Sequence, residues 1–388
     1  MKIGIITFHE SVNYGALLQA YALSSYLQKQ GHDVYIIDYN RRASDKGILL
    51  LLHKINVAIR MVLKKPFFLF SYIRNRLTKA SQNSFIGGNN EKTKIFDDLF
   101  RSFRRKNFRL TDFKYRFPLE LRMKPPKMDA YIAGSDQIWG HGQTSFSDAY
   151  FLNFGPKGIR RIAYAPSFGR PTLDKSWNKE LCRKIKRFDA VSVREKSGID
   201  IIQKACRRNA VKVLDPTLLL DDYSQITSNV NTEPFIFIYR LKQSEQLKSN
   251  FLKLTKNISD ELNLTTKVIA PMDKLGDDEN EILVGIEDFL GHVKNATFMI
   301  TNSFHGTVFA ILNKVNFICC ARTGTTEGQN DRMIGLLEEL NLLERYTNLD
   351  ENINYKQYIN NQINWEDVYS RLNKLREISI NFLNEALI

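Results

Sequence analysis

Several patterns that would assign this chain to a familiar class of site are absent from its sequence. The four cysteines include no CxxC pair and no spacing typical of metal ligands: Cys182, Cys206, Cys319 and Cys320. We therefore expect reduced thiols in a cytoplasmic protein without a metal site. No GxGxxG fingerprint follows the first predicted strand, so a bound dinucleotide is not expected, and we predict no cofactor.

The sequence also lacks long apolar runs and, over one stretch, negative charge. No apolar run reaches the ~20 residues of a membrane-spanning helix, and the N-terminus shows no signal-peptide pattern. Residues 46–90 contain no Asp or Glu but eight Lys and Arg, within a chain of net charge +14. This basic, apolar stretch is typical of a segment that lies on an anionic membrane surface. The alternative is a pair of packed helices whose charges face water; nucleic acid is not expected, because no nucleic-acid motif accompanies the charge.

The remaining patterning is that of an α/β protein. KIGIITF, an amphipathic helix and DVYIIDYN form a predicted βαβ unit, which implies a parallel sheet. A chain of 388 residues exceeds one ordinary core, and a polar linker at 221–234 separates two such patterns. We predict two Rossmann-like domains facing a cleft. The expected bounds are 1–225 with the basic insertion at 46–90, 232–346, and a helical tail at 347–388 that packs back on the core.

The stretch ATFMITNSFHGTVFAILNK places a histidine between a predicted buried strand and a predicted helix. In open parallel sheets, ligands bind beyond the carboxyl ends of the strands, and the first turn of a helix attracts anions. We predict that His305 exchanges a proton beside an anion site made of four small residues: Asn302, Ser303, Gly306 and Thr307. The alternative is that Asn302 or Ser303 caps the helix and His305 is structural.

Two other strand ends carry groups suited to such a site. Arg194 follows the apolar strand DAVSV and can bind a carboxylate or phosphate through two parallel contacts; an ion pair with Glu195 is the alternative. In AGSDQIWG, Asp136 is predicted to be a general base, or else a helix cap. Gln137 and Trp139 offer hydrogen bonds and a flat face to a sugar.

Two further loops complete the predicted site. Asn13, Tyr14 and Gly15 stand at the start of the first predicted helix and are candidates for contact with a sugar acceptor. The alternative is a capped helix in which Tyr14 packs in the core. The polar stretch TGTTEGQNDRM ends near Arg332, which is predicted to be a second contact to the anion.

These same motifs resemble the polysaccharide pyruvyl transferase family. The resemblance runs in order from residue 3 to about 346 through NYGALLQAYAL, AGSDQIW, YAPSFG, SVREKSG, ATFMITNSFHGTVFAI and DRMIGLLEELNLLER. It implies a GT-B-like fold, phosphoenolpyruvate as donor, a sugar diol as acceptor and a pyruvate ketal as product. Arg194 matches the first donor-binding arginine and His305 matches the histidine of an Arg-x-His cluster. Ser303 stands where that cluster has its arginine, so one cationic contact is missing.

The resulting hypothesis is a metal-independent pyruvyl transferase of exopolysaccharide or capsule biosynthesis. Its partners would be phosphoenolpyruvate and a sugar or lipid-linked oligosaccharide. Its expected location is the cytoplasm, with a peripheral position at the inner face of the plasma membrane through residues 46–90. One alternative is a GT-B-type glycosyltransferase that uses a nucleotide sugar. Another is a non-catalytic protein that binds glycans or polyanions.

Overall fold

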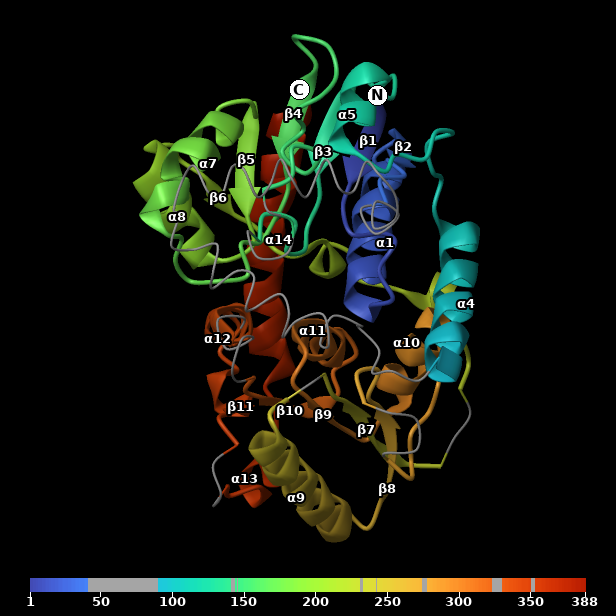
Figure 1. Ribbon diagram of the computed structural model, residues 1–388. Helices are drawn as coiled ribbons and strands as arrows, with labels where there is room; N and C mark the ends of the chain where they lie inside the picture. The colour runs from blue at the N-terminus through green and yellow to red at the C-terminus, as the bar shows by residue number, and fades with distance from the viewer. Residues whose placement is uncertain are drawn as a thin grey trace, which may run out of the picture.

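The computed structural model describes residues 1–40, 90–140, 144, 146–230, 233–241, 243–273, 278–322, 330–349 and 353–388. The chain folds into two α/β halves, one above the other in Figure 1, and each is built on a parallel sheet. This arrangement confirms the predicted fold class. The basic stretch at 46–90 falls almost wholly outside the described residues.

The first half contains a six-stranded sheet with the order β2-β1-β3-β4-β5-β6, and all its neighbouring strands are parallel. The strands are short and largely apolar; every residue of β3, for example, is buried. Helix α1 (Tyr14–Lys29) is the predicted crossover between the first two strands, and Asn13 caps it by accepting from the Ala16 N–H. The strands are β1 (Lys2–Ile6), β2 (Asp33–Ile36), β3 (Ala130–Ala133), β4 (Arg160–Ala163), β5 (Ala190–Val193) and β6 (Val211–Lys212).

The second half contains a five-stranded parallel sheet with the order β11-β10-β9-β7-β8. Helices α9 (Glu245–Leu262), α10 (Ile286–Asn295), α11 (Phe304–Leu312) and α12 (Asn330–Glu339) pack around it (Figure 1). In both sheets the strands are added on two sides of an inner strand. At this strand the loops that follow neighbouring strands lead away from each other, which leaves room for a ligand at the carboxyl ends of the strands. The strands are β7 (Phe235–Tyr239), β8 (Thr265–Ile269), β9 (Phe298–Thr301), β10 (Asn316–Cys320) and β11 (Tyr346–Thr347).

Two helices join the halves. Helix α4 (Asn90–Asn107) lies beside α10 (Figure 1), and its fully buried Lys92 donates to the Ala270 carbonyl and pairs with Glu281. The last helix, α14 (Trp365–Leu387), runs from the first half down to α11 of the second half in Figure 1. Its Tyr369 donates to the Leu312 carbonyl in the second half, whereas Ser379 accepts from the Leu214 N–H in the first half. These buried contacts hold the two halves in one relative position.

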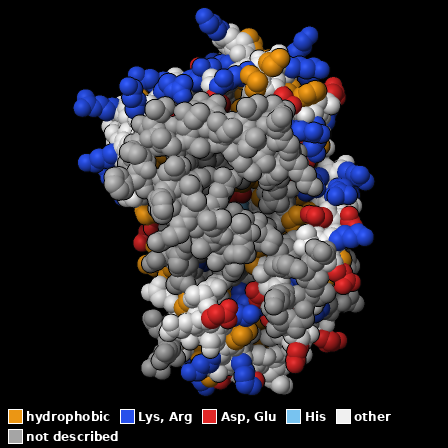
Figure 2. Space-filling view, viewed as in Figure 1, with side chains coloured by type: hydrophobic (Ala, Val, Ile, Leu, Met, Phe, Trp, Pro, Cys, Tyr) orange, Lys and Arg blue, Asp and Glu red, His pale blue; other side chains and the backbone are white. Residues whose placement is uncertain are grey.

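Within the described residues, no helix combines the length and apolarity needed to cross a membrane. On the face shown in Figure 2, lysine and arginine side chains gather around the upper part of the molecule, over the half built on the first sheet. The positive charge of the chain is thus visible outside residues 46–90.

Candidate active site

The four small residues predicted to bind an anion are hydrogen-bonded to the protein itself. Ser303 is the N-cap of α11, and its Oγ accepts from the Gly306 N–H at 3.3 Å. The Asn302 side chain accepts from the Leu241 N–H and donates to the Leu241 carbonyl, which ties together the ends of β9 and β7. Thr307 donates to the Ser303 carbonyl. These residues therefore shape the start of α11, as the alternative interpretation proposed, and a part in anion binding stays a prediction.

His305 projects from α11 into the first half of the molecule. Its Nε2 lies 3.6 Å from Oδ1 of Asp215. On its other edge the ring lies against Gly15 of α1, where an added Cβ would be 1.9 Å from Nδ1. The residue is only 7% exposed, so its ring is held between two elements of the opposite half.

Asp215 is the centre of the site, and it was not among the predicted residues. It is 1% exposed, and its Oδ2 accepts from Arg194 Nη1 and from Ser135 Oγ, each at 2.7 Å. Its Oδ1 accepts from the Thr217 hydroxyl at 2.6 Å. Burial alone would raise the pKa of this carboxyl, but His305, Arg194 and the hydrogen bond from Thr217 outweigh burial and hold the pKa well below its usual range.

Two arginines lie over one aromatic ring beside this carboxylate. The guanidinium carbons of Arg194 and Arg332 lie 4.9 and 5.8 Å from the centre of the Phe304 ring. Burial, joined by repulsion from Arg194, lowers the pKa of the Arg332 guanidinium to about 9. A buried guanidinium favours an anion close to it, and Arg194 has such partners in Asp215 at 2.7 Å and Glu195 at 3.9 Å. Arg332 is thus a second buried cation beside Phe304, the first residue of α11.

A pocket of about 610 Å³ opens beside these groups, between the start of α8 (Lys196–Cys206), α12 and α14. Arg194, Asp215, Phe304 and Arg332 all contribute to its wall. His305 is not among the described residues of that wall, but it lies 3.6 Å from Asp215, which is. The volume lies within the usual range for small-molecule sites.

Asp136 stands near the same cluster in an unusual backbone conformation. Its φ is 74°, in the left-handed region that residues with a side chain seldom adopt. Its Oδ1 accepts from the Gln137 N–H at 2.8 Å and lies 4.0 Å from Arg194 Nη2. Strained residues of this kind are held by their surroundings and cluster at functional sites. Gln137 is buried and packs against Gly169.

The structure buries both Trp139, which was predicted to offer a flat face to a sugar, and Tyr14, which was a candidate for contact with the acceptor. Trp139 is 0% exposed, stacks on Phe151 and donates from Nε1 to the Tyr150 carbonyl. Tyr14 is 1% exposed, stacks on Phe289 and donates to the Val284 carbonyl across the two halves. Both rings are occupied by core packing. The side chain of Asn13 serves as a helix cap.

The two predicted donor-binding arginines and both predicted proton-transfer residues therefore converge. Of the predicted acceptor residues, Gly15 lies against the His305 ring, whereas Tyr14 and Trp139 are buried in the core. Arg194, His305, Asp136 and Arg332 gather around Asp215 and Phe304. The sequence did carry one signal for Asp215: it follows the strand-like stretch VKVL and precedes a proline, so it stands just after a strand that neighbours the strand before Arg194.

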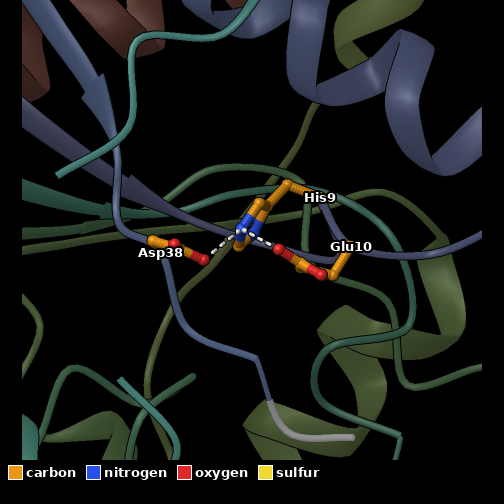
Figure 3. Close-up of side chains that lie close together, drawn as sticks. All are labelled: His9, Glu10 and Asp38. Atoms are coloured by element: carbon orange, nitrogen blue, oxygen red, sulfur yellow. Dashed lines mark hydrogen bonds and ion pairs between the residues drawn. The ribbon is translucent and has the colours of Figure 1, made fainter. Parts of the chain in front are cut away.

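Among the residues that the structure describes, one group has the composition of a metal site. His9, Glu10 and Asp38 bring their ligand atoms within 4.8 Å of one another at the carboxyl ends of β1 and β2 (Figure 3). Lys114 Nζ lies 3.3 Å from one Glu10 oxygen, and Asn40 donates to the other at 3.0 Å. The Glu10 carboxylate already has protein donors on both oxygens, so the arrangement is that of an internal ion-pair network.

The chain matches one family model and is distantly similar to several solved structures. The family model for polysaccharide pyruvyl transferase matches residues 13–324. No curated protein matches the chain significantly. Similar solved structures include the S. aureus MnaA–UDP co-structure, with 12% identity and a TM-score of 0.48 over 99% of this chain and 95% of that one. UDP-GlcNAc 2-epimerase from Methanocaldococcus jannaschii has 14% identity and a TM-score of 0.47 over 98% of this chain and 100% of that one. At this distance neither bears on the ligand of this chain.

Proposed function

This chain belongs to the polysaccharide pyruvyl transferase family, and from that premise we propose that it transfers pyruvate from phosphoenolpyruvate to two hydroxyls of a sugar. The product would be a cyclic ketal on a cell-surface polysaccharide or its lipid-linked precursor. The observation that carries the proposal is the pair of buried guanidiniums, Arg194 and Arg332, on the wall of one pocket beside Asp215 and His305.

The donor has two anionic groups, a carboxylate and a phosphate, so its site needs at least two cationic contacts. Arg194 and Arg332 supply them from opposite halves of the molecule. Both guanidiniums lie over the Phe304 ring, and this ring gives the methylene of the donor an apolar neighbour. In this assignment Arg194 holds the carboxylate and Arg332 faces the phosphate.

The reaction then needs one proton donor and one base. His305, as imidazolium, gives its proton to the methylene carbon, which becomes the methyl group and leaves positive charge at C2. A sugar hydroxyl adds to C2 and loses its proton to Asp136. The C2–O bond to phosphate breaks, inorganic phosphate leaves, and the second hydroxyl adds to C2. The proton of this second hydroxyl returns to His305, and the proton on Asp136 leaves with phosphate.

We also propose that the acceptor is carried on a membrane lipid and that residues 46–90 meet the anionic surface. The support is the absence of acidic residues over that stretch, together with its eight basic residues. Cosedimentation with vesicles containing phosphatidylglycerol, compared with purely zwitterionic vesicles, tests this. Equal binding to the anionic and the zwitterionic vesicles would show that the negative charge of the lipid does not attract the protein.

Donor choice is tested without knowing the acceptor. Titration calorimetry compares phosphoenolpyruvate with UDP-sugars, and the R194Q variant serves as the binding-site control. A panel of glycosides is then incubated with each donor while released inorganic phosphate and nucleoside diphosphate are assayed. The proposal expects binding of phosphoenolpyruvate, release of phosphate and an acceptor that gains pyruvate less one water. Release of nucleoside diphosphate would instead identify a glycosyltransferase, and glycan binding without turnover would identify a non-catalytic protein.

A further inference from the structure

The Asp215 carboxylate is fixed by the first half of the molecule but reaches a residue of the second half. Arg194 and Ser135 donate to one oxygen, and the Thr217 N–H and hydroxyl donate to the other. These four hydrogen bonds leave the carboxylate one orientation. His305, 3.6 Å away, comes from α11 across the boundary between the halves.

The His305 ring depends on that carboxylate for its position. Gly15 closes one edge of the ring and has no side chain to hold it. In the part of the chain that the structure describes, the charged groups on the other side include Asp215, then Arg194 beyond it, and Arg332 over the Phe304 ring. Among the described residues, Asp215 is the anion within ion-pair distance of Nε2, at 3.6 Å, and Nε2 makes no hydrogen bond there.

Stability alone does not explain a buried carboxylate at this place. A buried ion pair contributes little net stability compared with apolar packing of the same volume, because both charges lose their water. In this site the same carboxylate contacts one proposed donor-binding residue and the proposed proton donor, and it lines the pocket itself. An orienting role accounts for all three contacts.

We propose that Asp215 is a positioning residue that fixes the Arg194 guanidinium and the His305 imidazole relative to each other across the boundary between the two halves. The inference deepens the proposed function and rests on it for its catalytic consequence. The geometric consequence stands by itself: removing the charge at position 215 changes the surroundings of the His305 ring whatever the substrate is.

The first test is spectroscopic and needs no substrate. The chain has six histidines, and the ring ¹³C–¹H signal of His305 is assigned by its loss in the H305Q variant. D215N is expected to shift that signal at a fixed neutral pH. D148N is the matched control, because Asp148 also joins two cations, Arg122 and Lys184, and is expected to leave the signal in place. An unmoved His305 signal in folded D215N overturns the proposal.

The second test is kinetic and uses phosphate release from phosphoenolpyruvate. D215N is expected to lower kcat by roughly 10- to 100-fold, the scale of a misplaced catalytic group. H305Q added to D215N should then cost much less than H305Q alone, because the two residues act as one unit. If D215N and H305Q lower kcat independently, so that the loss in the double variant is the product of the two single losses, the positioning role is overturned. If the wild-type protein releases no phosphate from any donor mixture, the proposed function fails while the spectroscopic result still decides the role of Asp215.

A loss of folding would not hide the answer. Where D215N does not fold, D215E keeps the charge but lengthens the side chain by one methylene. It is expected to shift the His305 signal and to reduce kcat. A folded D215E protein with wild-type signal and kcat would contradict a requirement for the exact placement of this carboxylate.

Discussion

The ring of His305 lies against the backbone of Gly15, so closely that a Cβ at position 15 would fall 1.9 Å from Nδ1. The two residues are 290 positions apart in the chain, and each belongs to a different half. We predict that G15A pushes the ring away from Asp215 and lowers kcat by about 10²-fold, because small displacements of a catalytic group are costly. Overpacking should also cost roughly 1–3 kcal/mol of stability.

G285A is the control for that variant, because a Cβ at position 285 would meet Glu287 Oε2 at 3.7 Å, an ordinary van der Waals distance. Steady-state kinetics and thermal unfolding of both variants provide the comparison. A G15A protein with wild-type kcat would show that the ring need not stay where it lies.

Arg332 is predicted to replace the cationic contact that Ser303 cannot make. In R332Q we expect the KM for phosphoenolpyruvate to rise roughly 10- to 100-fold, the range for losing one charge-assisted hydrogen bond. R371Q is the control, since Arg371 forms a surface ion pair with Asp367 on α14. Equal KM values for R332Q and the wild type would remove Arg332 from the donor site.

The stability contributed by Asp215 should depend on pH. The folded protein holds the pKa of this carboxyl below the usual value, so its contribution is present above the unfolded pKa of about 4 and is lost as pH falls. D215N should therefore be less stable than the wild type by about 3–5 kcal/mol at neutral pH. The difference in stability between D215N and the wild type should become smaller as the pH falls into the acid range.

Thermal unfolding of wild type and D215N between neutral pH and acid measures that gap. D98N serves as control, because Asp98 pairs with Arg101 on an exposed surface. A gap that stays constant with pH would mean that the carboxylate charge contributes nothing at position 215.

We predict that Trp139 does not contact the acceptor, and the W139F variant tests this. Its burial and its stacking on Phe151 predict that W139F loses packing and one hydrogen bond, with a stability loss of about 1–3 kcal/mol. The KM for the acceptor should stay at its wild-type value. If W139F has normal stability but a raised KM for the acceptor, Trp139 does contribute to acceptor binding.

The sequence by itself determined the elements and the chemistry that they carry. Apolar runs such as AYIA and FMIT became buried strands, and Asn13 became a helix cap, because these outcomes depend on residues near one another in the chain. The position of Arg194 after one strand and of His305 after another followed from the same local pattern.

Only the tertiary structure decided which of these groups meet. Asp215 joins Arg194 to His305, Arg332 approaches Phe304, and Trp139 disappears into the core. Each of these results depends on how the two halves dock and how the strands are ordered. The local hydrophobic pattern of the sequence does not specify how the halves dock. Burial and the meeting of side chains depend on contacts between segments far apart in the sequence.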